Sequence, residues 1–226
     1  MNTYCEKMTY KLSPSRLGLF EECPRCFWLG CHKVWDRPSG AFPSLPAGMD
    51  RILKEHFDRF MGSGELPPEL CDNHECKDMR LFGSSDMEQE LLKAWRNNRK
   101  GISWQDSEGN VLYGAVDNIL VKDKKLVILD YKTRGYPTKE DTTAHYQNQL
   151  DIYTFLLEKN SYNTEDYAFL LFYVPKQVLR TGEVLFDTEL VKMKTDSKKA
   201  EALFRKALEL LNGNCPKETC EWCEKV

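Results

Sequence analysis

An aspartate and a lysine at the end of an apolar run are the side chains of this sequence best suited to chemistry. Asp130 and Lys132 are separated by one residue, so on a β-strand they point to the same face. They follow residues 126–129, Leu-Val-Ile-Leu, a run typical of a strand that is covered on both faces. A carboxylate in such a place is costly unless it is paired or binds a metal ion.

Asp117 joins this pair if the chain forms a β-hairpin. We expect one strand over residues 111–121, a polar turn over 122–125 and a second strand over 126–131. Aspartate oxygens suit Mg²⁺ or Mn²⁺, and Lys132 could position or deprotonate a water molecule or stabilise developing negative charge. The expected chemistry is metal-assisted hydrolysis of a phosphodiester bond. Solvated charges at strand ends are the alternative.

These residues resemble the core motif of the PD-(D/E)xK nucleases. The matching pattern is Gly114-x-x-Asp117 followed by Asp130-Tyr131-Lys132. The resemblance implies an α/β, restriction-endonuclease-like fold, in which a mixed central β-sheet is flanked by α-helices. It also implies that Asp117, Asp130 and the backbone carbonyl of Tyr131 bind the divalent ion, and that Lys132 acts on the water.

A second motif resembles the RecB-like branch of the same family. Gln149 and Tyr153 are four residues apart and share one face of an expected helix. The resemblance implies that they contact substrate or orient the catalytic groups. Without the preceding hairpin, a core tyrosine with a glutamine as hydrogen-bond partner would be the simpler interpretation.

Two residues after the expected second strand could bind the scissile phosphate. Thr133 offers a hydroxyl donor, and Arg134 offers a guanidinium that can bind a phosphate through two hydrogen bonds. We therefore expect both to contact substrate. An ordinary surface arginine is the alternative for Arg134.

The resemblance further implies a metal ligand on an upstream helix, which we expect over residues 46–61. Asp50, Glu55 and His56 are the candidates, and His56 or Glu55 is the expected ligand. A histidine held in the core and a solvated glutamate are the alternatives.

Nine cysteines suggest a second metal site. Cys23 and Cys26 form a Cys-x2-Cys pair near one end of the chain, and Cys220 and Cys223 form another near the other end. Four thiolates suit Zn²⁺ or an iron–sulfur cluster, and ligands so far apart would join the two terminal segments. Resemblance to cluster-bearing RecB-like nucleases, including the CRISPR-associated RecB-type exonucleases, favours [4Fe–4S] over zinc and leaves Cys215 as the alternative to Cys26. Free buried thiols would explain the pattern without a metal.

Composition limits the remaining possibilities. The chain has 226 residues, 41% of them hydrophobic, and a net charge of −3, which is enough for one core and leaves no overall basic field. We expect one nuclease domain over residues 1–226, with its core at about 102–195, an N-terminal helical part at 13–100 and a C-terminal helix and cysteine tail at 196–226. The sequence lacks a long apolar run and an apolar leader, so we expect no membrane association and a cytoplasmic location.

The remaining expected elements follow from apolar periodicity and capping residues. Ser13 is a good N-cap for a first helix, and Pro175 is expected to end a strongly apolar strand. The further helices are expected at residues 87–98, 138–159 and 197–211, and the further strands at 102–104, 167–174 and 183–193.

The expected function is metal-dependent hydrolysis of DNA, with exonuclease action on single-stranded ends. This substrate, a role in DNA repair, recombination or CRISPR adaptation, and a helicase or CRISPR integrase as partner are implied by the resemblance alone. The alternative is a non-catalytic nucleic-acid-binding or assembly subunit that a zinc or iron–sulfur site stabilises.

Overall fold

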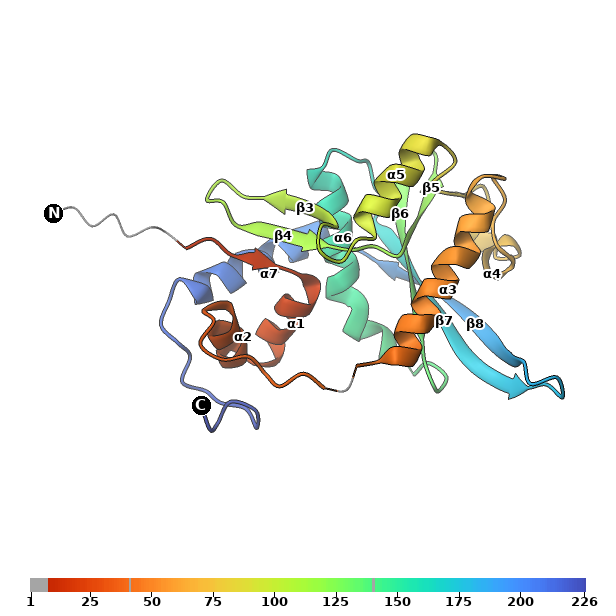
Figure 1. Cartoon of the computed structure of the whole chain (residues 1–226). Coiled ribbons are helices and arrows are strands. Elements are labelled where there is room, and N and C mark those ends of the chain that lie inside the picture. Colours follow the sequence, from red (N-terminus) through yellow and green to blue (C-terminus); the bar gives the residue numbers. More distant parts are fainter. Residues whose placement is uncertain (1–7, 41, 140) are drawn as a thin grey trace.

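A computed structural model describes residues 8–40, 42–139 and 141–226, and its centre is a mixed five-stranded sheet (Figure 1). The strand order is β2-β5-β6-β7-β8. The pair β6–β7 is parallel and the other neighbours are antiparallel, which confirms the expected mixed sheet. The strands are β2 (Arg80–Leu81), β5 (Asn118–Lys122), β6 (Lys125–Thr133), β7 (Tyr167–Val178) and β8 (Val184–Lys194).

A second, three-stranded sheet lies beside the first and was not expected. Its order is β1-β4-β3, with β1 at Lys11–Leu12, β4 at Val111–Gly114 and β3 at Ile102–Gln105. The prediction of one strand over residues 111–121 was therefore wrong, because β4 and β5 belong to different sheets. The chain leaves β4 after Gly114, and the Val116 backbone N–H then donates to the carbonyl of Trp95.

The β5–β6 hairpin is the predicted one, although its second strand runs two residues further than expected. Its two-residue turn places Asp123 and Lys124 at φ of 47° and 67°, the left-handed conformation that tight hairpin turns require. Asn118 pairs with Leu129, so Asp117 lies just before β5 and beside Asp130. The apolar strand residues 127–129 are fully buried, as the unbroken run predicted.

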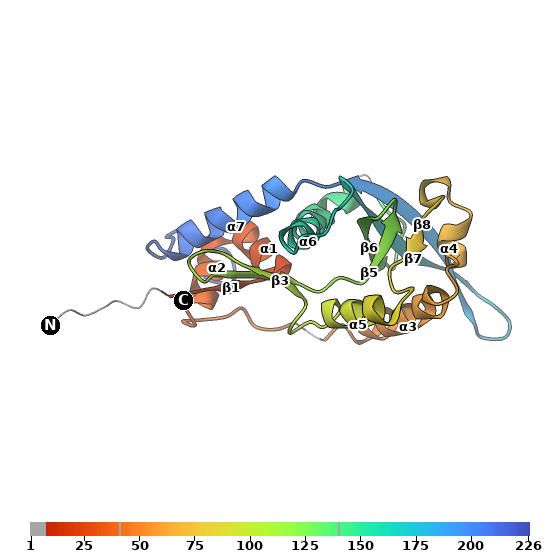
Figure 2. The same ribbon diagram turned by 90° about the horizontal axis from the view of Figure 1, so that it is seen from above.

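Helices cover both faces of the central sheet (Figure 2). On one face α6 packs against β6, with α7 outside it, and α3 and α5 lie on the other face. Among the described residues, no helix has both the length and the apolar character needed to cross a membrane. The helices are α1 (Pro14–Glu22), α2 (Pro24–Cys31), α3 (Ser44–Met61), α4 (Pro68–Cys71), α5 (Asp86–Trp95), α6 (Gln147–Lys159) and α7 (Ser197–Leu211), with 3₁₀ turns at His74–Cys76 and Thr142–Tyr146.

The helix expected over residues 87–98 ends at Trp95, and two further boundaries differ more clearly from the expected ones. The helix expected over residues 138–159 begins only at Gln147, because the preceding segment forms a 3₁₀ turn whose Thr142 hydroxyl binds the Lys139 backbone N–H. The strand expected to end at Pro175 continues to Val178, with an irregularity between Pro175 and Gln177 where proline cannot donate to the ladder. The resulting long β7–β8 pair extends beyond the body of the protein (Figure 1).

Candidate active site and cysteine cluster

The strand β6 carries the predicted pair of charged groups on its α6-facing side. Asp130 is 1% exposed, and its Oδ2 atom lies 2.5 Å from the Nζ atom of Lys132. The ammonium group also lies 5.0 Å from the ring centre of Tyr146, where a cation is attracted to the aromatic face. Burial weakens solvent screening, so the charges of this pair interact strongly.

Asp117 and a second lysine extend this charged group. Asp117 forms an ion pair with Lys54 of α3, in which the Lys54 Nζ atom lies 3.2 Å from the Asp117 Oδ1 atom. The same Nζ lies 2.8 Å from a carboxylate oxygen of Asp50, one helical turn earlier. Three carboxylates and two ammonium groups therefore meet where β5, β6 and α3 come together, and sequence reasoning did not include Lys54.

The protonation states of the central groups follow from burial and their neighbours. Burial, followed by the adjacent Asp117 carboxylate, raises the pKa of Asp130 to about 7, although Lys132 opposes this rise. Burial lowers the pKa of the Lys132 ammonium group, but Asp130 and Asp117 outweigh this effect and raise it above its usual value. Lys132 is therefore a cation at neutral pH.

Helix α6 supplies the next layer of contacts. The Gln149 Nε2 atom donates to the Asp130 Oδ1 atom over 3.3 Å and to the Tyr153 hydroxyl over 2.8 Å. Because Gln149 and Tyr153 are one turn apart on the same helix face, both side chains reach the strand together. Gln149 orients Asp130, and Tyr153 orients Gln149.

Gly114, the first residue of the motif, makes room for this tyrosine. A Cβ atom at Gly114 would lie 2.6 Å from Cε1 and 2.9 Å from Cδ1 of Tyr153. These distances are well inside van der Waals contact, and the Tyr153 ring is buried and cannot easily withdraw. The glycine and the Gln-x-x-x-Tyr motif are therefore coupled by packing.

Replacing Gly114 with alanine is expected to destabilise the protein by about 1–3 kcal/mol, the usual cost of overpacking a filled core. Gly48→Ala is the matched control, because a Cβ there meets no atom within 4 Å and the site is helical. Chemical denaturation monitored by circular dichroism would measure both. Equal stability of the two variants would contradict the proposed contact with Tyr153.

Four of these charged residues, Asp50, Lys54, Asp117 and Lys132, line a cavity of about 370 Å³, and Asp130 lies buried beside it. It adjoins a second cavity of about 530 Å³, and the two share Asn98, Ala115, Gln149 and Tyr153. The first is lined in addition by Pro46, Asp50, Leu53, Lys54, Asp117, Tyr131, Lys132 and Thr133.

A sequence model of the PD-(D/E)XK nuclease superfamily matches residues 11–225. The chain belongs to this superfamily. No curated protein matches the chain significantly. The family that the motif of Asp117, Asp130 and Lys132 predicted is therefore confirmed, and membership supports a nuclease, because nucleases that use divalent metal ions make up most of this superfamily.

The helix α3 places its candidate ligands differently from the expectation for a PD-(D/E)XK site. Glu55 pairs with Arg51 on the surface at 2.7 Å, and the His56 Nε2 atom lies 3.1 Å from a Glu69 carboxylate oxygen. Neither Glu55 nor His56 lines the cavity. Asp50 is the acidic residue of this helix that does, and it shares Lys54 with Asp117.

Of the two residues expected to contact phosphate, Thr133 and Arg134, only one lines the cavity. Thr133 lines the same cavity as Asp117 and Lys132. Arg134 does not, and its backbone N–H donates to the Tyr173 carbonyl at the end of the β6–β7 ladder. The backbone of Tyr131 lies in the part of β6 that pairs with β7 but not with β5. Its ring packs on the α3 side of the sheet against Phe57, with ring centroids 5.1 Å apart.

The donor set fits a divalent ion of the kind that this superfamily uses. The Asp130 Oδ2 atom is buried and lies against the Lys132 ammonium group, and the Asp117 carboxylate is close enough to raise the pKa of Asp130. Two neighbouring carboxylates, one of them buried, are suited to a hard cation such as Mg²⁺ or Mn²⁺. Asp130, Asp117 and the Tyr131 carbonyl are the groups that would hold it.

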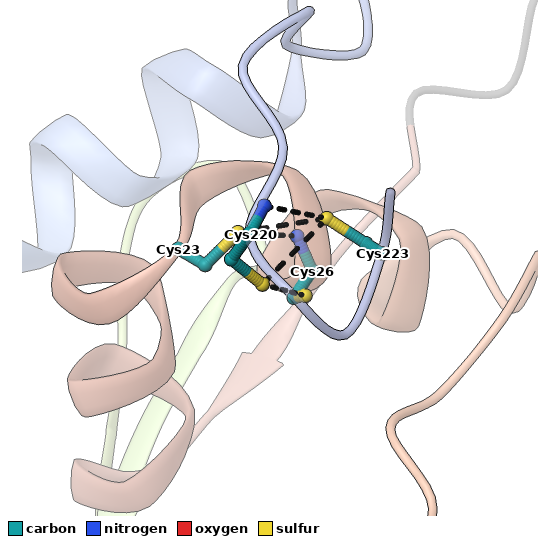
Figure 3. A group of neighbouring side chains, drawn as sticks. All are labelled: Cys23, Cys26, Cys220 and Cys223. Carbon is teal, nitrogen blue, oxygen red and sulfur yellow. Dashed lines mark hydrogen bonds between the residues drawn. The ribbon is translucent and has the colours of Figure 1, made fainter. Parts of the chain in front are cut away.

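A second constellation lies away from this cavity and consists of four thiols (Figure 3). Cys23 and Cys26 lie at the start of α2, and Cys220 and Cys223 come from the C-terminal tail. Their sulfur atoms all lie within 4.8 Å of one another. The four cysteines could bind a metal ion or cluster that joins the N- and C-terminal regions.

Cys215, the alternative to Cys26, does not belong to this group. Its sulfur atom accepts a hydrogen bond from Arg25 over 3.5 Å. Cys26 is the fourth member of the group instead, and its sulfur atom lies 3.5 Å from that of Cys220. The Arg37 guanidinium donates to the Cys220 sulfur, also over 3.5 Å, and places a positive charge beside the thiols.

Proposed function

We propose that the chain is a divalent-metal-dependent deoxyribonuclease that degrades single-stranded DNA from an end. The observation that carries this proposal is that Asp117 and Lys132 line one cavity, while the buried Asp130 carboxylate beside them contacts Lys132 and accepts a hydrogen bond from Gln149. The alternative, a non-catalytic nucleic-acid-binding or assembly subunit, would not require a buried lysine–carboxylate pair beside a second carboxylate.

The catalytic groups have distinct roles in this proposal. Asp117, Asp130 and the Tyr131 carbonyl hold Mg²⁺ or Mn²⁺, which when bound lowers the pKa of a water molecule and neutralises phosphate charge. Lys132 acts as a cation that orients the attacking water or stabilises the negative charge that develops on phosphate. Its raised pKa argues against a role as a general base in the metal-free protein.

Other side chains complete the site. Gln149 and Tyr153 keep the Asp130 carboxylate in its orientation. The Thr133 hydroxyl contacts the scissile phosphate from within the cavity. Arg134 lies outside it and would have to reach a neighbouring phosphate from the following loop.

The adjoining cavity supports a single-stranded substrate. Its lining includes Tyr113, His145 and Tyr146, which offer ring faces on which unpaired bases can stack. It also includes Ser13 and Ser15 at the N-terminus of α1, where hydroxyl and backbone donors favour a phosphate. A strand whose bases are free could occupy both cavities, whereas paired bases could not stack on these rings.

The biological setting that we propose rests on the RecB-like resemblance. It comprises DNA repair, recombination or CRISPR adaptation, with a helicase or integrase as partner. Copurification of the tagged chain from its own host would test this part, and recovery of no DNA-processing protein would contradict it.

The function is tested by incubating end-labelled single-stranded and duplex DNA with Mn²⁺ and the purified chain. Wild-type protein is expected to shorten the single strand progressively, and Asp130→Asn is expected to leave it intact. An intact strand after incubation with folded, metal-supplied wild type would overturn the proposal in favour of the binding or assembly role. Cleavage of an unlabelled circle would show endonuclease action instead.

Divalent metal is expected to stabilise the wild type in a pH-dependent manner. The pKa of Asp130 is raised from 3.8 to about 7, so the folded metal-free protein binds more protons than the unfolded chain in this range. The metal-free protein therefore loses stability as pH rises from about 4 to about 7. Mn²⁺ must displace the proton from Asp130, so the Mn²⁺-induced rise in Tm should grow over the same range.

Differential scanning fluorimetry at several pH values, with and without Mn²⁺, measures this effect. Asp130→Asn is the control. Its neutral amide cannot ionise to a carboxylate, so the variant should show little Mn²⁺-induced stabilisation at any pH. A Mn²⁺-induced shift in wild type that does not change with pH would contradict the assignment of Asp130 as a ligand.

A further inference from the structure

The distances between the four cysteine sulfurs distinguish a single ion from a cluster. Cys23 and Cys223 lie 3.8 Å apart, Cys26 and Cys220 lie 3.5 Å apart, and Cys220 and Cys223 lie 3.8 Å apart. All four sulfurs lie within 4.8 Å of one another and form one compact group (Figure 3). Each distance is far too long for a disulfide bond.

One tetrahedral zinc ion accounts for these distances. Zinc binds thiolates at about 2.3 Å, and a tetrahedron with that bond length places its sulfurs about 3.8 Å apart. A [4Fe–4S] cluster, by contrast, has four irons and four sulfides between its thiolates, so those thiolates must lie further apart than in a mononuclear site. The cysteines do not fit the cluster that the family resemblance implied.

We propose that Cys23, Cys26, Cys220 and Cys223 bind one Zn²⁺ ion as a closed structural site. The pairing of two Cys-x2-Cys segments is independent support, because it is the spacing of tetrahedral zinc sites. The chain positions these thiolates through its own backbone. The Cys26 N–H donates to the Cys23 sulfur over 3.5 Å, and the Cys220 N–H donates to the Cys223 sulfur over 3.4 Å.

The surroundings suit a negatively charged four-thiolate site. Cys23, Cys26 and Cys223 are buried, and Leu29 packs with them in an apolar cluster that shields them from water. The Arg37 guanidinium, which donates to Cys220, partly balances the charge of the thiolates. With all four positions filled by cysteine, this zinc has no open position for water and is structural.

The proposed zinc holds α2 in place, and α2 packs against α1, the helical wall of the second cavity. Arg25 of α2 donates to the carbonyls of Pro216 and Val226 in the tail, each over 2.9 Å, so the ion and these bonds join the same two segments. The preceding helix α1 lines the second cavity through Ser13 and Ser15. Loss of zinc would therefore loosen a wall of this cavity without removing any group that binds the catalytic ion.

The decisive experiment is metal analysis of the full chain purified without oxygen from cells supplied with both iron and zinc. We expect one zinc per chain, no acid-labile sulfide and no brown colour. About four irons and four sulfides per chain, with broad visible absorption, would overturn the proposal. One iron per chain without sulfide would also overturn the zinc proposal, because the four-cysteine geometry would then hold a different metal.

Reconstitution separates a native zinc site from zinc that has replaced a lost cluster. Metal-free chain is offered Zn²⁺ in one sample and ferrous iron with sulfide in another, and each sample is desalted before analysis. We expect stoichiometric zinc uptake with recovery of Tm, and no stable iron–sulfur product. A stable four-iron product with the higher Tm would overturn the proposal.

Two variants test the ligand set. Cys26→Ser is expected to lose most of the bound zinc, whereas Cys215→Ser is expected to keep one zinc per chain. Retention by Cys26→Ser together with loss by Cys215→Ser would show that the wrong cysteine was assigned. If Cys26→Ser fails to fold, the Cys215→Ser result alone still decides whether Cys215 is a ligand.

Discussion

Replacement of Lys132 by alanine is expected to reduce the rate of DNA cleavage by about 10²- to 10⁴-fold, the range for loss of a positioned group that acts on protons or developing charge. Its Nζ atom lies 2.5 Å from Asp130 in a site that is shielded from solvent. The alanine variant therefore loses the only ammonium group that contacts Asp130 among the described residues. End-labelled single-stranded DNA with Mn²⁺ gives the rate.

Lys125→Ala is the matched control for Lys132→Ala. Lys125 begins the same strand and pairs with Glu165 near the surface at 3.4 Å, far from the cavity. The Lys125→Ala variant should cleave DNA at nearly the wild-type rate. Mn²⁺-induced stabilisation of Lys132→Ala should persist, because both metal-binding carboxylates remain, and this distinguishes a catalytic loss from a loss of metal. Wild-type cleavage by Lys132→Ala would contradict the assigned role.

The part of the site that could be predicted from sequence is the part that depends on local geometry. Asp130 and Lys132 share a face because strand side chains alternate, and Asp117 lies beside them because a two-residue turn sets the hairpin register. Gln149 and Tyr153 share one helix face and a hydrogen bond because they are one helical turn apart. None of these local arrangements depends on how distant segments pack.

The contribution of α3 to the cavity depends on such packing. Asp50 and Lys54 are four residues apart, so the sequence already places them on one helix face. That spacing alone predicts a surface ion pair. Only the placement of α3 against β6 shows that Lys54 also reaches Asp117, whereas His56 reaches Glu69. The angle of the helix against the sheet, which no local pattern encodes, decides between them.

The second sheet was missed for a related reason. The sequence of residues 111–121 is typical of one apolar strand. In the structure, however, Gly101 has a φ of +56° and packs closely on Gly114, and a Cβ atom at Gly101 would lie 2.1 Å from the Gly114 carbonyl oxygen. This close contact belongs to the β3–β4 pair and helps hold Gly114 in the smaller sheet. The break after Gly114 then frees Asp117 to turn toward Asp130.

Replacement of Cys223 by serine is expected to cause the largest loss of stability of any single change in the chain. Cys223 is fully buried and belongs to the four-thiol group. Binding of a structural metal by four cysteines contributes about 10–16 kcal/mol in small zinc domains, and that free energy adds to the stability of the fold. The variant should lose its metal, and the tail should become sensitive to proteases.

Cys76→Ser separates the loss of metal from the cost of burying a hydroxyl. Cys76 is also fully buried, but it lies in the main core and outside the four-thiol group. Its replacement should cost only about 1–3 kcal/mol, the penalty for a buried polar group without a partner. A much larger loss of stability in Cys223→Ser than in Cys76→Ser, measured by chemical denaturation, would therefore come from the metal. Equal losses would mean that the four thiols pack as ordinary core residues and that the two ends of the chain are held together by packing and the Arg25 hydrogen bonds.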